Sequence, residues 1–163
     1  MASESSFDVV SQFDRQELVN AIDQVEREVT TRYDLKSTGT EIQLTTDKLT
    51  VATGTDFTLK QVRDVIVEKL TRRNLDTRIL DWGKVTPAAR GTVRQEATLK
   101  QGITAELGRE MVKFIKSANP KTRPQIQGDA VRVFAKSRDE LQSVIQSLKQ
   151  KEWPAPLQFV NYR

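Results

Sequence analysis

The segment QIQGDAVRVFAKSRDELQSVIQSL, residues 125–148, contains the local signals that decide the fold. Two alternating runs flank Gly128-Asp129, and such a pair between alternating runs is typical of a two-residue β-hairpin turn. Ser137 and Glu140 then have the spacing of a capping box, which begins a helix. Apolar residues recur at helical spacing at Leu141, Val144, Ile145 and Leu148. The segment therefore predicts a hairpin followed by an amphipathic helix.

The same order of elements occurs earlier in the chain at a nearly constant offset. Alternation predicts paired strands over 40–45 and 48–53, joined by a turn at Thr46-Asp47. Thr58 and Gln61 form a capping box for the helix that follows. The outer elements are strands over 7–13, 77–82, 92–100 and 157–162, and helices that begin after Asp14 and near Thr104. The pattern is β-α-β-β-α-β, and it occurs twice.

This repeat predicts an α+β protein of two ferredoxin-like βαββαβ domains. Each would be a four-stranded antiparallel sheet with two helices on one face. The stretch Gly83–Gly91 contains Pro87 and is the expected connector between the halves. The expected domains are therefore residues 1–86 and 87–163.

The residue types that are absent restrict the chemistry. The chain has no histidine and no cysteine. Zn²⁺ and most transition metals therefore lose their preferred ligands, and Ser-His or Cys-His nucleophile pairs cannot form within the chain. We expect no metal, no cofactor and no catalytic activity.

The charge balance favours a polyanionic partner. Lys and Arg number 26 against 22 Asp and Glu, which gives a net charge of +4 and a pI near 9.4. The N-terminal residues lack the basic start and apolar stretch of a secretory signal, and no apolar run approaches the ~18 residues of a membrane span. We expect a cytoplasmic protein that does not associate with membranes.

A sheet face is the first candidate binding site, because the glycines do not form a phosphate-binding loop motif. In the run 131–136, alternation directs Arg132, Phe134 and Lys136 away from the helices. A basic residue beside an exposed aromatic on a sheet surface is typical of RNA-binding sheets. Tyr162 and Arg163, on the last strand, would extend this surface. The alternative is that Phe134 fills the contact between two sheets or domains.

Two further basic groups are candidates for nucleotide or nucleic-acid binding. The first lies on and after the third helix and comprises Lys113, Lys116, Lys121 and Arg123. The second is the loop that contains Arg32, Tyr33 and Lys36, which suits a phosphate and a base. The alternatives are a solvated helix face for the first group, and a helix exit with Tyr33 packed on the sheet for the second.

Five motifs resemble the YajQ family in order and spacing. They are SFDVVS at 6–11, RYDLKS at 32–37, IQGDAVRV at 126–133, RDELQSVI at 138–145 and PLQFVNYR at 156–163. The resemblance implies two ferredoxin-like domains that exchange their N-terminal strands, so that 7–13 would belong to the second half's sheet and the domains would be discontinuous. It also implies nucleotide binding, contact with RNA and, in some members, a role as cyclic di-GMP effector that acts through transcription regulators.

The match departs from the family pattern at two of the candidate sites. Leu35 and Ser37 stand where the family has an aromatic residue and a glycine, and Phe134-Ala135 stands where Thr-Gly is common. The leading hypothesis is a nucleotide-binding protein without catalytic activity, with GTP, ATP or cyclic di-GMP as ligands and RNA as a further one. The alternative is a protein-interaction adaptor that binds a transcription regulator or a ribosomal component.

Overall fold

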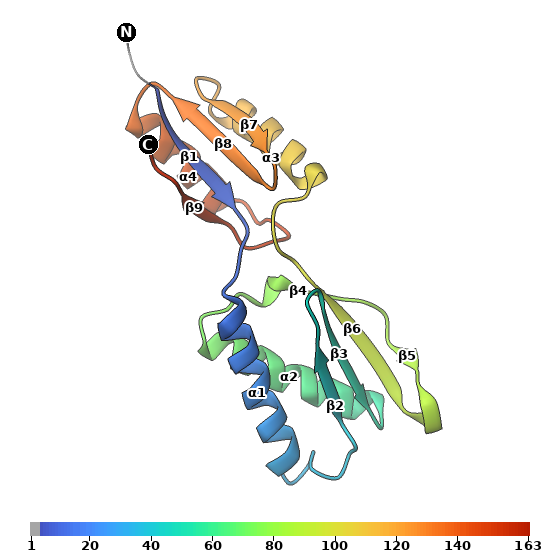
Figure 1. Cartoon of the computed structure of the whole chain (residues 1–163). Helices are drawn as coiled ribbons and strands as arrows, with labels where there is room; N and C mark the ends of the chain where they lie inside the picture. Colours follow the sequence, from blue (N-terminus) through green and yellow to red (C-terminus); the bar gives the residue numbers. More distant parts are fainter. Residues whose placement is uncertain (1–3) are drawn as a thin grey trace. The chain divides into compact units, whose positions relative to one another are not determined.

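The computed structural model describes residues 4–163, which form two compact units. The central unit is Phe13–Lys100. The terminal unit joins residues 4–12 to Gln101–Arg163 (Figure 1). Over the described residues the chain forms four α-helices and two antiparallel sheets, which confirms the predicted α+β class with two ferredoxin-like domains.

The central unit has a sheet with the strand order β2-β3-β6-β4. Its strands are β2 (Glu41–Leu44), β3 (Lys48–Thr53), β6 (Val93–Leu99) and β4 (Leu80–Trp82), and β5 (Thr86–Pro87) also pairs with β6. The helices α1 (Arg15–Thr31) and α2 (Asp56–Arg72) lie side by side on one face (Figure 1). Their apolar stripes and the inward residues of β3 and β6 form the core of this unit. Short 3₁₀ turns occupy Thr77–Ile79 and Ala89–Gly91.

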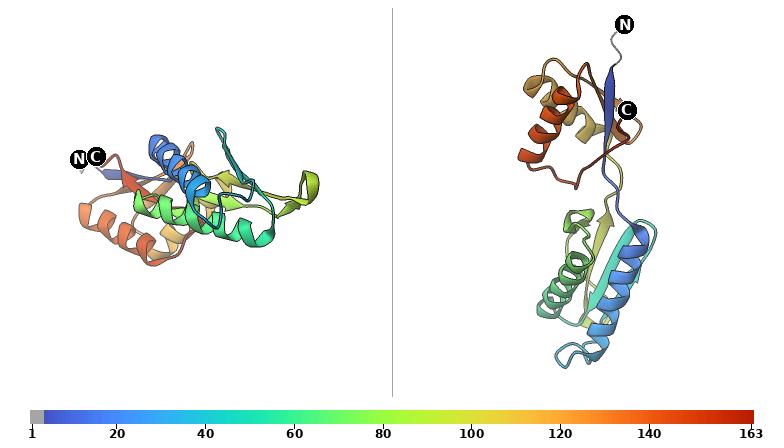
Figure 2. Two further views of the ribbon diagram at one scale, coloured as in Figure 1. Left: turned by 90° about the horizontal axis from the view of Figure 1, so that it is seen from below. Right: turned by 90° about the vertical axis from the view of Figure 1, so that its left-hand side faces the viewer.

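The terminal unit repeats this architecture with the strand order β7-β8-β1-β9. Its strands are β7 (Arg123–Gln127), β8 (Ala130–Ala135), β1 (Ser5–Val10) and β9 (Gln158–Val160). Its helices are α3 (Ala105–Ala118) and α4 (Arg138–Gln150), which cover the same side of β1 (Figure 2). The core consists of the inward residues of β1 and β8 and the apolar stripes of both helices.

The first strand of each βαββαβ set lies in the other set's sheet. β1 pairs with β8 and β9, whereas β6 pairs with β3 and β4. The unit boundaries therefore fall between Gln12 and Phe13 and between Lys100 and Gln101, not at the contiguous division 1–86 and 87–163. The predicted connector Gly83–Gly91 belongs to the central unit, because its residues Thr86 and Pro87 pair with β6.

Side-chain caps fix the start of each helix. Asp14, Thr104 and Ser137 each accept hydrogen bonds from backbone N–H groups of the first turn, as their positions in the sequence predict. The start of α2 differs from the prediction. Its N-cap is Thr55, whose hydroxyl accepts from the backbone N–H of Thr58 at 3.1 Å, so the helix begins one turn before the predicted capping box.

Candidate functional site

The face of the terminal sheet opposite α3 and α4 carries the first candidate site. Along β8, Val131, Val133 and Ala135 are buried in the core, whereas Arg132 and Phe134 on the other side remain partly exposed. This confirms the orientation that alternation predicts for the strand. Lys136, directly after β8, is exposed.

A hydrogen-bonded carboxylate holds Arg132 in place on this face. Asp8 of β1 lies opposite Arg132, and its oxygens accept from the Arg132 Nε at 2.8 Å and Nη2 at 3.3 Å. The amide of Asn161 donates a further bond to Asp8 at 2.9 Å. The bond from Arg132 lowers the pKa of Asp8, with burial as a smaller opposing effect, and the bond to Asp8 in turn raises the pKa of Arg132. Arg132 therefore keeps its charge and a fixed orientation, and its Nη1 has no hydrogen-bond partner within residues 4–163.

Phe134 is paired with a cation from the neighbouring strand. The guanidinium of Arg123, opposite Phe134 in the β7–β8 register, lies 4.7 Å from the ring centroid. Arg123 also forms an ion pair with Glu4 at 2.8 Å. Cation–π contact of this kind orients both groups. The structure thus brings together two candidates, Arg123 and Phe134, that the sequence assigned to different groups.

We call this surface the cationic face and define it by Arg123, Arg132, Phe134, Lys136 and Asp8. Three of its five side chains are cations and one is an aromatic ring. Arg132 and Arg123 are each held by one carboxylate, whereas Lys136 forms no ion pair with any residue in 4–163. Such a surface can stack a planar ring and bind an anionic group beside it.

Tyr162 does not lie where the sequence places it. β1 lies between β8 and β9, and a β-bulge at Asn161, whose φ is 56°, inserts one residue after β9. The backbones of Ser6 and Arg163 exchange two hydrogen bonds of 3.0 Å, so Arg163 stands opposite Ser6. Tyr162 is thereby turned to the other side of the sheet, where its ring stacks on Phe7 with centroids 6.1 Å apart. Arg163 remains close enough to Asp8 for its charge to lower the Asp8 pKa.

The lysines of the group on and after the third helix are exposed. Lys113 and Lys116 are on α3, and Lys121 is in the turn before β7. Within residues 4–163 these lysines form no ion pair. They extend the positive charge of the terminal unit beyond its sheet.

The third candidate group lies in the central unit, in the loop after α1. Arg32 is held by Asp34 at 2.7 Å and by Glu28 at 3.3 Å, and Asp34 raises its pKa. Tyr33 is 88% exposed, and the Nζ of Lys36 lies 5.3 Å from its ring centroid. The alternative that Tyr33 packs on the sheet is therefore wrong. Leu35, not Tyr33, is the residue of this loop that is buried in the core.

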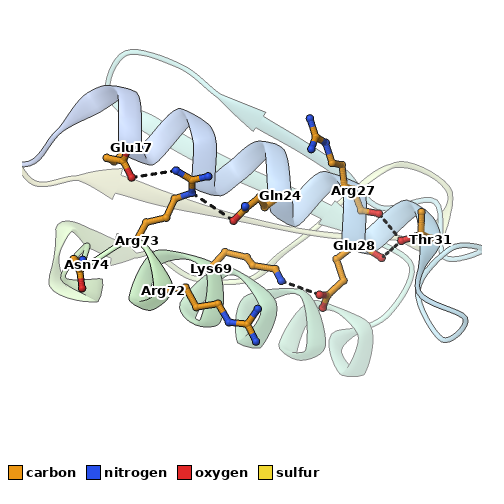
Figure 3. A pocket seen from close by; sticks show the side chains of 9 residues that line it. All are labelled: Glu17, Gln24, Arg27, Glu28, Thr31, Lys69, Arg72, Arg73 and Asn74. Carbon is orange, nitrogen blue, oxygen red and sulfur yellow. Dashed lines mark hydrogen bonds and ion pairs between the residues drawn. The ribbon is translucent and has the colours of Figure 1, made fainter.

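A groove between α1 and α2 contains polar side chains that the sequence did not single out. Lys69 reaches Glu28 at 3.0 Å, and Arg73 reaches Glu17 at 3.1 Å and the amide of Gln24 (Figure 3). The bond from Lys69 lowers the pKa of Glu28, against a smaller opposing effect of burial.

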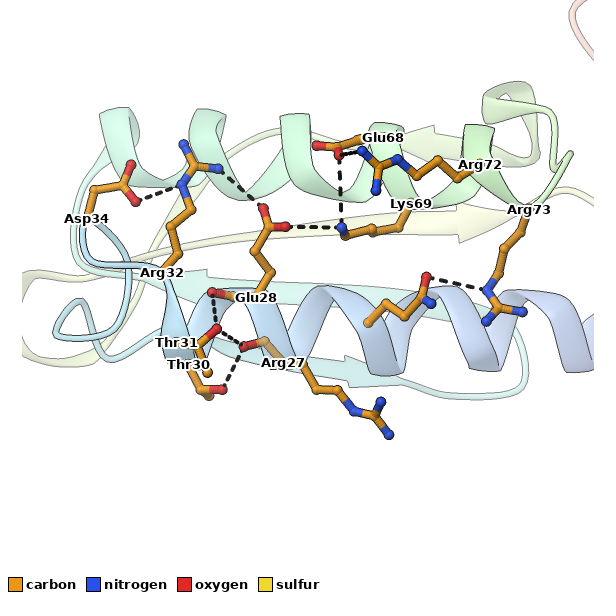
Figure 4. A network of polar contacts seen from close by, with 11 residues as sticks. Arg27, Glu28, Thr30, Thr31, Arg32, Asp34, Glu68, Lys69, Arg72 and Arg73 are labelled. Atoms are coloured by element: carbon orange, nitrogen blue, oxygen red, sulfur yellow. Dashed lines mark hydrogen bonds and ion pairs between the residues drawn. The ribbon is translucent and has the colours of Figure 1, made fainter.

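The network continues along both helices. Arg72 pairs with Glu68 at 2.8 Å, and Arg32 joins Glu28 to Asp34 (Figure 4). The side chain of Arg27 points away from α2 in the same view. Because most of its cations are paired with carboxylates, the groove joins two helices and offers less free charge to an anionic ligand than the cationic face.

Two other kinds of site find no support in the part of the chain that the structure describes. Among residues 4–163, no cluster of three or more acidic residues could hold a metal ion. No helix within these residues has the length and hydrophobicity needed to cross a bilayer.

Comparisons with known proteins agree on one family. A family model described as nucleotide-binding protein YajQ-like matches residues 5–163. A nucleotide-binding protein of Trichormus variabilis is 52% identical over 163 residues, and one of Trichodesmium erythraeum is 53% identical over 163 residues. A nucleotide-binding protein of Chloroflexus aurantiacus is 52% identical over 165 residues. Each match covers the whole of both chains.

Proposed function

Because the chain belongs to the YajQ-like family of nucleotide-binding proteins, we propose that it binds nucleotides without turnover and that the cationic face of the terminal unit is the site. The proposal covers nucleoside triphosphates and cyclic di-GMP, which share a planar base and anionic phosphate. The names of the relatives support nucleotide binding as such, and the geometry of the face supports the location.

One observation carries the location. Arg132 and Phe134 lie on the same side of the same strand, β8. Two hydrogen bonds to Asp8 of β1 fix the position of Arg132. A preoriented guanidinium loses little conformational freedom when it binds phosphate, so less of the interaction energy is spent on ordering. The ring of Phe134, two residues along β8, lies at a suitable spacing for the base of the same ligand.

The other residues of the face have distinct roles in this proposal. Arg123 can remain over Phe134 and present its planar guanidinium to a base, or move aside so that the base stacks on the ring. Lys136 supplies a flexible cation for a second phosphate. Asp8 is a positioning residue, since it acts through Arg132.

The same arrangement argues against turnover. Asp8 accepts bonds from Arg132 and Asn161, and its lowered pKa makes it a weak base at neutral pH. The chain also lacks histidine and cysteine, the usual groups for proton transfer and nucleophilic attack near pH 7.

A titration with single variants tests the site. We expect saturable binding of ATP, GTP or cyclic di-GMP by the full chain. Phe134→Ala should weaken it by about 1–3 kcal/mol through lost stacking, and Arg132→Gln roughly tenfold or more. Arg94→Gln is the matched control, because Arg94 lies on β6 of the central unit and its removal changes the charge equally.

Three outcomes would contradict the proposal. Arg94→Gln could weaken binding as much as Arg132→Gln, which would indicate a general charge effect. Phe134→Ala could lower the melting temperature sharply while the folded fraction binds normally, which would make Phe134 a structural residue. Absence of saturable binding to any of the nucleotides at moderate salt would favour the protein-interaction adaptor.

RNA is a second candidate ligand, favoured by the exposed Lys113, Lys116 and Lys121 next to the β7 edge. A strand that follows these lysines would make several phosphate contacts, and its affinity would fall steeply with salt. We expect the triple variant of these lysines to Gln to reduce the salt slope of tRNA binding by about 2–3. A mononucleotide on the cationic face should be unaffected by the same variant.

A further inference from the structure

A hollow at the β9 edge of the terminal sheet combines features that point to a second ligand. It has a volume of about 320 Å³ and is lined by Ser5, Ser6, Arg138, Leu141, Gln142, Tyr162 and Arg163. Ligand pockets have volumes of roughly 300–1,000 Å³, so the hollow has room for one small molecule. We call it the edge hollow, because it lies where α4 faces the β9 edge of the sheet.

The aromatic wall of the edge hollow is built by the β-bulge at Asn161. Phe159 stands opposite Val9 on the helix side of the sheet, and regular alternation would turn Tyr162 to the other side. The extra residue restores Tyr162 to the side of Phe159, and both rings contact Phe7. Asparagine tolerates the positive φ that this bulge requires. The bulge therefore aims Tyr162 into the edge hollow.

Tyr162 offers a ring that is supported on one side and open on the other. Its ring is inclined at 27° to that of Phe7, which is fully buried, yet Tyr162 remains 59% exposed. An aromatic side chain that is both held by the core and exposed is a suitable stacking platform, because little conformational freedom is lost when a second ring is added. Leu141, buried beneath the hollow, adds apolar contact.

The polar wall is cationic. Arg138 lines the edge hollow, and within residues 4–163 it forms no ion pair with a carboxylate. Arg163 also lines the hollow, but it stands opposite Ser6, on the side of the sheet that carries Asp8. Gln142, one turn after Arg138 on α4, adds an amide that can donate and accept hydrogen bonds. The hollow thus places an unpaired arginine and an amide beside an exposed ring.

We propose that the edge hollow is a second binding site, for a planar aromatic ring that carries an anionic group. The ring stacks on Tyr162, Arg138 binds the anion, and Gln142 contacts the ring edge. A purine nucleoside monophosphate has this chemistry. The inference goes beyond the proposed function, because Arg138, Gln142 and Tyr162 do not belong to the cationic face.

Binding of GMP to the full chain, followed by NMR, tests the second site directly. We expect the amide signals of Leu141 and Gln142 to shift in a saturable manner, separately from those of Arg132 and Phe134. Ribose 5-phosphate, which has no aromatic ring, and guanosine, which has no phosphate, should each bind the edge hollow at least about tenfold more weakly than GMP.

Matched variants separate the two sites. Arg138→Gln and Tyr162→Ala should each weaken binding at the edge hollow roughly tenfold or more and leave the cationic face unchanged. Tyr162→Phe, which keeps the ring, and Lys149→Gln, which removes a charge elsewhere on α4, are the controls and should bind normally. Tyr162 is largely exposed, so Tyr162→Ala is expected to fold, which its circular dichroism spectrum checks.

The failures of the two proposals are distinguishable. One site that Arg132→Gln abolishes, with no shift at Leu141 or Gln142, overturns the edge hollow and leaves the proposed function in place. One site that Arg138→Gln abolishes and Arg132→Gln spares supports the edge hollow and overturns the proposed location of nucleotide binding. Equal binding of GMP and ribose 5-phosphate at the hollow overturns the role of Tyr162 as a stacking platform.

Discussion

The two units have the same topology, but corresponding strands present different chemistry. β3 and β8 are each followed by a helix whose N-cap is Thr55 or Ser137, so the two strands can be aligned by their distance from the cap. In this alignment Thr50 and Ala52 of the central unit correspond to Arg132 and Phe134 of the terminal unit. The inward residues of both strands are buried and small or aliphatic. The scaffold therefore constrains one side of each strand and leaves the other side free to differ.

The strand that crosses between the sets differs in the same way. Glu96 of β6 lies opposite Thr50, whereas Asp8 of β1 lies opposite Arg132. Glu96 is 40% exposed and contacts both Lys48 and Arg94, while Asp8 is buried and accepts hydrogen bonds from Arg132 and from the amide of Asn161. The carboxylate of the central face neutralises surface charge. That of the terminal face orients one guanidinium, which in the proposed function binds the ligand.

The two units also differ in whether ion pairs join their helices. In the central unit Lys69 and Arg73 form ion pairs that join α1 to α2, besides the ion pairs of Glu96 on the sheet. In the terminal unit they lie on the sheet, at Arg123 and Arg132. One unit uses its charge to hold helices together, whereas the other presents it beside an aromatic ring.

The largest expected effect tests whether the units are separate folding entities. Phe7→Ala removes a fully buried ring that contacts Phe159 and Tyr162, and should destabilise the terminal unit by about 3–5 kcal/mol. Each unit contains one tryptophan, Trp153 in the terminal unit and Trp82 in the central unit. In a Trp82→Phe background, the unfolding transition reported by Trp153 should move to lower denaturant concentration. In a Trp153→Phe background, the transition reported by Trp82 should not move.

Leu49→Ala in the core of the central unit is the reciprocal change. It should cost about 2–5 kcal/mol and move only the Trp82 transition. If both tryptophans report the same shift for both variants, the exchanged strands make the chain one cooperative unit, and the comparison of separate units would not apply to stability.

A smaller effect is expected when the corresponding carboxylates are neutralised. Asp8→Asn leaves Arg132 without its ion pair and should cost about 1–3 kcal/mol, together with weaker nucleotide binding. Glu96→Gln should cost less than about 1 kcal/mol, because its ion pairs are exposed. Chemical denaturation and nucleotide titration of both variants measure the difference. Equal losses of binding would remove the positioning role of Asp8.

The dependence on pH should distinguish the units further. The pKa values of Asp8 and Glu28 are both lowered by a hydrogen bond from a cation. A carboxyl group whose pKa is lower in the folded state contributes stability above its unfolded pKa, near pH 4, and loses it as the pH falls through the folded pKa. Below about pH 4, the free energy of unfolding should therefore fall less in these variants than in the unchanged chain. The fluorescence of Trp153 reports this for Asp8→Asn, and that of Trp82 reports it for Glu28→Gln. An unchanged acid transition in both variants would contradict these pKa directions.

Local pattern predicted the parts of the fold that depend on neighbouring residues in the chain. Alternation placed Arg132 and Phe134 on the side of β8 away from the helices, and Ser137 with Glu140 marked the start of α4. The start of α2 was misplaced because Thr55 and Thr58 both have a suitable cap residue type, and only the backbone decides between them. The exchange of strands came from the family resemblance, since alternation in an antiparallel strand does not specify its partner.

The polar partners of the site could not be predicted in the same way. Asp8 contacts Arg132 only because β1 lies beside β8, and Arg123 reaches Phe134 only through the hairpin register. Regular alternation predicts the wrong side of the sheet for Tyr162, because the residue inserted at the β-bulge reverses the sides of the residues that follow it. Asn161 at the end of β9 was the available signal, since asparagine is one of the few residues that favour positive φ.

The smallest expected effect concerns Tyr33, whose aromatic ring is more exposed than any other within residues 4–163. Its ring contacts Lys36, and Arg32 is occupied by Asp34 and Glu28, so Tyr33→Ala should change the free energy of unfolding by less than about 0.5 kcal/mol.

If nucleotides bind the cationic face, the affinity of Tyr33→Ala for them should also be unchanged, whereas Phe134→Ala lowers it. A loss of affinity in Tyr33→Ala with intact binding in Phe134→Ala would reverse the comparison and make the loop of the central unit the site. Because both variants remove an aromatic ring, and Tyr33 and Phe134 each lie under a cation, the pair differs mainly in the unit that carries the ring. Titration of both variants with the same nucleotide therefore decides which unit binds.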